Sequence, residues 1–307
     1  MKRVYGHKDD EGKWVRPVPE KDDEYTYQWN SEWADDLTKP ILKITKSSMS
    51  TFKWCKKQFE FSYLDRRPIE QNAAMLKGTV IHDSHEMFYK QVDMDKVKDS
   101  TFIEIKDYFQ TLFPIDDYTE MTEKMSTFEA ERYLNFKKAG ILENFLPVGN
   151  EVMLNARILI QRDTDVKHPL NRDYVVHLQG IVDRVFKEDD HFIPMELKTG
   201  AWKDSKKTGL RRELAFYKLL MDSSDECDLT PIKHWGWYFP ENNHLTIEPV
   251  KKQTTNALKK SIAGMIYAYE LDEFPPTYFH KKCVWCEFQD ICPAAIDAGL
   301  NEGSDWF

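Results

Sequence analysis

The chain has 307 residues, a formal net charge of -9 at pH 7, 41% hydrophobic residues and 31% charged residues. These values predict one main packed domain and exclude a disordered chain. No apolar run is long enough to span a membrane and no signal peptide is recognisable, so we expect a cytoplasmic protein without a membrane partner.

The first two predicted elements are an irregular arm and a helix. Residues 1–44 are rich in charged and aromatic side chains but have no sustained period, which is typical of an irregular arm. From Thr45 the apolar spacing predicts a helix that contains Cys55. A second helix begins near Gly78 and places His82 on a partly polar face.

The middle of the chain changes from helical to strand patterning. A helical insertion is predicted at about 95–147, broken near Pro114. Strands follow, and the turn at Asp189 joins two of them into a hairpin. The predicted strands cover 152–160, 174–186, 191–198, 234–239 and 245–250, and the later helices cover 210–221 and 254–270.

The hairpin within residues 174–198 carries the most informative charges. Because side chains alternate along a strand, Glu196 and Lys198 share one face and Leu197 points to the other. Asp183 on the partner strand reaches the charged face, and the backbone carbonyl of Leu197 offers a further oxygen. This donor set suits Mg²⁺ or Mn²⁺ and phosphodiester hydrolysis, with Lys198 holding the attacking water or stabilising the transition state. The alternative is an exposed cross-strand ion-pair network.

Basic residues gather beside these segments although the total charge is negative. The negative total disfavours a general nucleic-acid binder, because neutralising phosphates requires a basic surface. A local DNA-binding surface is nevertheless expected, and a solvated face is the alternative. The groups are Lys53, Lys56, Lys57, Arg66 and Arg67, then Lys203, Lys206, Lys207, Arg211 and Arg212, then Lys281 and Lys282.

The cysteines predict a metal site better than a disulfide framework. Cys283, Cys286 and Cys292 are an odd number of thiols in one short segment, which disulfides within that segment cannot use up. Thiolates ligate zinc and iron-sulfur clusters, and Cys55 is the natural fourth ligand. Cys227 remains as a spare, inert thiol.

In their order along residues 45–293, these motifs resemble the RecB-like exonuclease branch of the PD-(D/E)XK nuclease superfamily. The resemblance implies that His82, Asp183 and Glu196 bind metal and that Lys198 is catalytic. Without it, His82 would more often be a helical surface histidine. The motif segments are Gly78–His82, Gly180–Asp183, Glu196–Gly200 and Glu213–Tyr217.

The fourth motif departs from the branch, because Glu213 stands where the branch has glutamine. Glu213 and Tyr217 are four residues apart and share a helix face, so both are predicted to support Lys198. The carboxylate is expected to pair with Lys198 or to draw in a second metal. It also removes amide donors that a phosphate would accept.

The resemblance also implies the cofactor and the fold. Iron-sulfur RecB-like nucleases, including AddB-type subunits and CRISPR-associated adaptation exonucleases, join one N-terminal cysteine to three near the C-terminus. A [4Fe-4S] cluster on Cys55, Cys283, Cys286 and Cys292 is therefore expected, with zinc as the alternative.

The expected fold is an α/β restriction-endonuclease-like core, with a central mixed sheet flanked by helices. It carries the helical insertion at about 95–147. The iron-sulfur clamp is predicted at 45–65 plus 280–293, and a C-terminal tail at 294–307.

The function implied by the branch is an exonuclease that prefers single-stranded DNA ends. Recombination, repair, CRISPR adaptation and viral DNA processing are all open, and a helicase or a CRISPR-adaptation protein is the expected partner. One alternative is a non-catalytic DNA-binding or assembly subunit with a structural cluster, but such a protein has no need of Asp183, Glu196 and Lys198 together. Another is a structural zinc protein whose hairpin charges are incidental.

Overall fold

The computed structural model describes residues 5–17, 29–70, 72–113 and 118–300. The chain divides into two compact units, which are described separately. The first unit comprises Met1–Glu70, Asn155–Gln179 and Asn256–Phe307, and the second comprises Gln71–Leu154 and Gly180–Thr255. Within the described ranges, no helix has the length and apolar character needed to cross a membrane.

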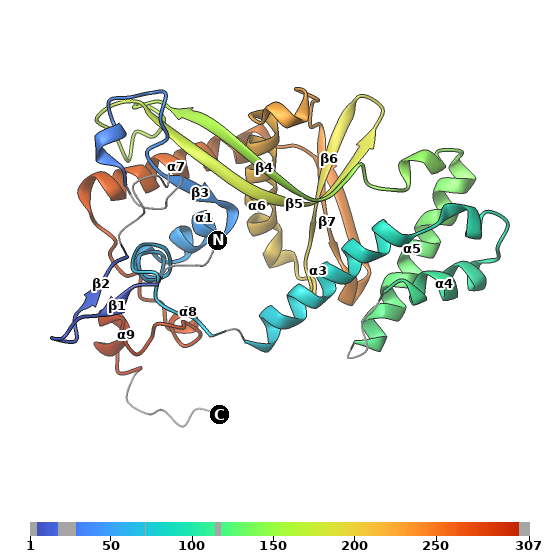
Figure 1. The fold of residues 1–307 in the computed structure, drawn as a ribbon, viewed down its shortest axis with the longest axis horizontal. Helices are drawn as coiled ribbons and strands as arrows, with labels where there is room; N and C mark the ends of the chain where they lie inside the picture. Colours follow the sequence, from blue (N-terminus) through green and yellow to red (C-terminus); the bar gives the residue numbers. More distant parts are fainter. Residues whose placement is uncertain (1–4, 18–28, 71, 114–117, 301–307) are drawn as a thin grey trace. The chain divides into compact units, whose positions relative to one another are not determined.

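The strands and helices can be followed in Figure 1. The strands are β1 (His7–Lys8), β2 (Trp14–Val15), β3 (Lys43–Thr45), β4 (Gly149–Ile160), β5 (Tyr174–Glu188), β6 (His191–Leu197), β7 (His234–Phe239) and β8 (His244–Pro249). The helices are α1 (Lys46–Trp54), α2 (Lys56–Phe59), α3 (Ala73–Gln91), α4 (Phe102–Thr111), α5 (Thr119–Ala139), α6 (Lys207–Asp222), α7 (Lys252–Leu271), α8 (His280–Cys283) and α9 (Pro293–Ile296).

The larger sheet has the strand order β3-β5-β6-β7-β8, and β4 also pairs with β5. β3 runs parallel to β5 and β6 runs parallel to β7, whereas β5 with β6 and β7 with β8 are antiparallel. The sheet is therefore mixed. The predicted α/β class, with a central mixed sheet flanked by helices, is confirmed.

In the first unit, the start of α1 is fixed by a reciprocal cap. The Ser48 backbone N–H donates to Thr45 Oγ1 at 3.1 Å, and the Thr45 N–H donates to Ser48 Oγ at 2.8 Å. The predicted helix does not continue through Cys55, whose backbone is extended (φ -160°, ψ 122°) between α1 and α2. This break turns the thiol out of the helical repeat.

The predicted N-terminal arm is more ordered than expected where it is described. β1 pairs with β2, and the Trp14 indole donates to the backbone carbonyl of Asp65 at 2.9 Å. Arg16 Nε donates to the Asp65 carboxylate at 2.8 Å. The arm therefore packs on the segment that follows α2. The last residues of the predicted tail, 301–307, lie outside the described residues.

In the second unit, α3 begins earlier than predicted because Asn72 caps it. The Asn72 side chain accepts from the backbone N–H of Met75 at 3.0 Å, so the helix starts at Ala73 instead of near Gly78. α4 and α5 form the predicted helical insertion and pack against each other (Figure 1). The predicted break near Pro114 lies outside the described residues.

The apolar core of the second unit joins this helical insertion to the sheet. Phe88 of α3 stacks on Phe113 with ring centroids 4.6 Å apart. Leu197 of β6 and Tyr238 of β7 are buried in the same cluster. Leu197 therefore points to the apolar side of the sheet, as the strand alternation predicts.

Because two histidines are buried, we expect the fold to lose stability in acid. Burial lowers the pKa of His85 well below its usual range, with help from the charges of Arg184, His82 and Arg132. Burial, Lys43 and Arg157 lower the pKa of His177 to about 4.

Each of these histidines binds a proton in the unfolded chain below about pH 6.5 but stays neutral in the fold. We therefore expect the free energy of unfolding to fall by about 1.4 kcal/mol per pH unit per histidine below that pH. Denaturant titrations at pH 7 and pH 5.5 measure this slope. His85→Phe should reduce it, and an unchanged slope would show that His85 is not buried neutral.

Candidate active site

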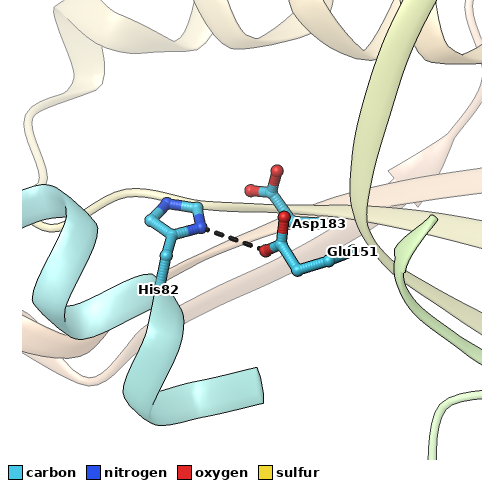
Figure 2. Close-up of side chains that lie close together, drawn as sticks. All are labelled: His82, Glu151 and Asp183. Atoms are coloured by element: carbon cyan, nitrogen blue, oxygen red, sulfur yellow. Dashed lines mark hydrogen bonds and ion pairs between the residues drawn. The ribbon is translucent and has the colours of Figure 1, made fainter. Parts of the chain in front are cut away.

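Three potential metal ligands from three elements of the second unit converge on one point. α3 carries His82, β4 carries Glu151 and β5 carries Asp183, and Figure 2 shows the three side chains facing one another. One ligand atom from each lies within 4.8 Å of the other two. His82 Nδ1 is 3.3 Å from Glu151 Oε1.

Glu151 was not among the residues that the sequence predicted. It comes directly before the predicted start of its strand, and no motif marks it. Its φ of +49° lies in the left-handed region, which is uncommon for residues other than glycine. Such strain costs of order 1 kcal/mol and is concentrated at functional sites, which makes Glu151 a candidate ligand on independent grounds.

Asp183 is buried and held by two donors. The backbone N–H of Leu197 donates to Asp183 Oδ2 at 2.7 Å, and the Tyr217 hydroxyl donates to Oδ1 at 3.0 Å. Burial raises the pKa of Tyr217 well above its usual range, and the charges of Glu196 and Asp183 raise it further. Tyr217 thus stays protonated and acts as a fixed donor between the two carboxylates. The predicted grouping of Asp183, Glu196 and Tyr217 is observed.

Lys198 forms ion pairs with two carboxylates. Its Nζ lies 2.7 Å from Glu196 Oε1 and 2.7 Å from Glu213 Oε2. The Glu196 side chain is only 2% exposed, so this is not the exposed ion-pair network considered as the alternative. Burial by itself lowers the pKa of Lys198, but Glu196 and Glu213 outweigh it and raise that pKa. Lys198 is therefore a permanent cation here.

The same negative charges act on His82. Burial by itself lowers the pKa of His82, but the hydrogen bond with Glu151 and the charges of Asp183, Glu151 and Glu196 raise it above its usual value. Four carboxyl groups thus surround one ammonium group and one imidazole. This excess of negative charge is what a divalent cation would neutralise.

The predicted site residues are therefore brought together, with one difference in arrangement. Within the described part of the chain, the group of three mutually close ligand atoms contains Glu151 in place of Glu196. Glu196 Oε1 is held by Lys198 instead. The predicted contribution of the Leu197 carbonyl stays a prediction. One imidazole nitrogen and several carboxylate oxygens fit Mg²⁺ or Mn²⁺.

We expect Glu151→Gln to weaken Mn²⁺ binding by about 10- to 100-fold, because it removes a negative charge next to His82 and Asp183. Isothermal titration with Mn²⁺ measures the affinity. The matched control is Glu188→Gln, which neutralises an exposed glutamate at the end of β5. Equal affinities for the Glu151 variant and wild type would exclude Glu151 from the metal site.

The four predicted cluster cysteines line one small cavity in the first unit. Its volume is about 20 Å³, and its walls include Cys55, Cys283, Cys286 and Cys292. Burial raises the pKa of Cys286 to about 11, and the nearby thiols of Cys55 and Cys292 contribute to that rise. The fifth cysteine, Cys227, is buried elsewhere and does not line this cavity.

Side-chain contacts join the two segments of the chain that line this cavity. Gln58 Nε2 donates to Glu287 Oε2 at 3.0 Å, and the rings of Phe61 and Phe288 meet edge to face at 5.3 Å. Residues near the N-terminus thus contact residues near the C-terminus directly beside the thiols.

The thiols of Cys55, Cys283, Cys286 and Cys292 are a suitable ligand set for zinc or for an iron-sulfur cluster, because thiolates bind both.

A mixed sheet that carries carboxylates and a lysine on neighbouring strands is the arrangement of a restriction-endonuclease-like nuclease. The family model of the PD-(D/E)XK nuclease superfamily matches residues 43–293. The chain therefore belongs to this superfamily. Membership implies a nuclease, and a nuclease domain implies DNA as the substrate.

Comparisons with individual proteins add little to this assignment. The solved structure described as "Crystal structure of SSO0001" matches with 15% identity and covers 72% of this chain and 97% of that chain. The TM-score of 0.32 is too low for this match to support a conclusion about the present chain. No curated protein matches the sequence significantly.

Proposed function

We propose that this chain is a Mg²⁺- or Mn²⁺-dependent DNA exonuclease of the RecB-like branch that acts on single-stranded ends. The observation that carries the proposal is the placement of Lys198 between Glu196 and Glu213, on the strand pair that also holds Asp183. An ammonium group beside several carboxylates is an arrangement suited to metal-assisted phosphodiester hydrolysis.

Each residue has a distinct task in the proposed reaction. His82, Asp183 and Glu196 would hold the metal, with Glu151 as an additional ligand. When bound, the metal would lower the pKa of a water and neutralise charge on the phosphate. Lys198 keeps a positive charge beside the phosphate as negative charge develops on it. Tyr217 and the Leu197 N–H fix the orientation of Asp183 through the hydrogen bonds described above.

Glu213 is the residue that distinguishes this site from the rest of the branch. Of the two roles expected for its carboxylate, the ion pair with Lys198 is favoured by the distance of 2.7 Å. We infer that Glu213 fixes the direction of the ammonium group, as the branch glutamine would do through its carbonyl oxygen.

The second part of the proposal is a [4Fe-4S] cluster on Cys55, Cys283, Cys286 and Cys292. Their shared cavity supports a metal centre at these four thiols, and the resemblance to iron-sulfur RecB-like nucleases favours the cluster over zinc. The cluster would be structural, because its ligands come from the two ends of the chain and lie in a different compact unit from His82 and Asp183.

Exposed aromatic and basic groups near the cysteines support binding to single strands. The Trp285 side chain is 78% exposed, and Lys282 lies 4.0 Å from the ring centre of the half-exposed Trp54. Bases stack on such rings without regard to sequence. A helicase or a CRISPR-adaptation protein would present the DNA ends.

Linear and circular single strands of equal sequence test the exonuclease part of the proposal. With Mn²⁺, we expect the linear strand to be degraded to short products and the circular strand to remain intact. Equal cleavage of both would establish an endonuclease. Binding of both without cleavage would favour a non-catalytic DNA-binding subunit.

A further inference from the structure

A cavity of about 190 Å³ lies in the second unit, on the side of the sheet away from the candidate active site. Arg184 and Met195, which line it, each follow a site residue, Asp183 and Glu196. Because side chains alternate along a strand, the cavity and the active site occupy opposite faces of β5 and β6. We call this cavity the rear pocket.

The walls of the rear pocket are largely apolar. They combine rings from α5 with aliphatic side chains from the two strands β6 and β8, among them Phe128, Phe136, Ile193, Met195 and Ile247. Ile247 on β8 is 52% exposed, so the pocket is open to solvent on that side. An apolar cavity of about 150 Å³ accepts benzene, so this volume is enough for one aromatic ring.

One end of the pocket carries a closed polar network. The Tyr89 hydroxyl donates to Glu129 Oε1 at 2.7 Å, and Arg132 Nε donates to Glu129 Oε2 at 2.9 Å. Arg132 Nη2 donates to the Tyr89 oxygen at 3.3 Å. The Glu129 side chain is fully buried, and its negative charge is matched by its ion pair with Arg132.

Arg184 adds a second guanidinium to this end, and no ion pair with it is found among the described residues. Arg184 is only 4% exposed, and its Nη2 is buried without a hydrogen-bond partner among the described residues. The centre of the Tyr89 ring lies 5.3 Å from the guanidinium carbon of Arg184. A buried, unpaired cation costs several kcal/mol, so a partner that enters the pocket would recover that energy.

We propose that the rear pocket binds a small organic carboxylate with an apolar body about the size of one aromatic ring. The carboxylate would accept hydrogen bonds from Arg184, whose planar fork matches two carboxylate oxygens. The apolar body would fill the space among Phe136, Ile193 and Ile247. None of these residues belongs to the proposed catalytic set.

Phenylacetate and its neutral analogue phenylacetamide are the probes, and isothermal titration of the full chain is the measurement. We expect phenylacetate to bind at least about tenfold more tightly than the amide. Arg184→Met should weaken phenylacetate binding by about 10- to 100-fold, because a charge-assisted hydrogen bond is lost. Lys233→Met, which removes an exposed positive charge that pairs with Asp190 and does not line the pocket, should bind as wild type does.

A second variant and a stability measurement separate binding from misfolding. Ile247→Trp adds bulk at the open side of the pocket and should abolish binding while the melting temperature stays near that of wild type. Arg184→Met should melt at or above the wild-type temperature, because it removes an unmatched buried charge. The proposal is overturned by equal binding of acid and amide, by unchanged binding to Arg184→Met, or by no binding at millimolar phenylacetate.

Discussion

Lys198→Ala is expected to reduce DNA cleavage by about 100- to 1,000-fold, because it removes the ammonium group that we propose stabilises the developing charge on the phosphate. The variant should still bind Mn²⁺. The deletion leaves Glu196 and Glu213 without their shared cation, so the affinity for a divalent ion should stay the same or rise. Single-turnover cleavage of end-labelled DNA and isothermal titration with Mn²⁺ measure the two effects separately.

The matched control for this variant is Lys218→Ala. Lys218 lies on α6, the helix that carries Glu213 and Tyr217, but pairs with Asp222 at 2.7 Å. We expect its activity to equal that of wild type. Cleavage by Lys198→Ala within about twofold of wild type would contradict the proposed role of Lys198.

Cys286→Ser is expected to have the largest effect on stability. If the four thiols hold a [4Fe-4S] cluster, protein prepared without oxygen is brown, with broad visible absorbance and with iron and sulfide bound. The binding of a metal centre contributes its free energy to folding. Losing one thiolate should therefore lower the free energy of unfolding by about 5 kcal/mol or more. For a chain of this size, that loss lowers the melting temperature by roughly 10 °C or more.

Cys227→Ser controls for the loss of a thiol as such, since Cys227 is buried away from the cavity. It should keep the visible absorbance and the iron content. Zinc in place of iron in the wild-type protein would overturn the cluster proposal. So would a Cys286→Ser protein that keeps its iron and its melting temperature.

The chemistry on the strands could be predicted because a strand has a simple geometry. Alternation alone put Glu196 and Lys198 on one face and Leu197 on the other, and the structure places them so. Helical spacing likewise put Glu213 and Tyr217 on one face of α6. These predictions needed only the period of each element.

Features that depend on contacts between elements could not be predicted in this way. Glu151 reaches His82 through a left-handed residue at the start of β4, and no sequence period encodes that conformation. The extended backbone at Cys55 interrupts a continuous helical pattern. The unmatched charge of Arg184 likewise arises from packing, since the sequence does not reveal that Arg132 already satisfies Glu129.

Metal-dependent hydrolysis of DNA is the most direct test of the central claim. Purified chain is incubated with end-labelled linear single-stranded DNA and Mn²⁺, with and without excess chelator, next to Asp183→Asn. We predict cleavage by the wild-type chain that the chelator abolishes and that Asp183→Asn lacks. Cleavage that persists with the chelator or in Asp183→Asn would contradict the account, as would a wild-type chain inactive with both Mn²⁺ and Mg²⁺.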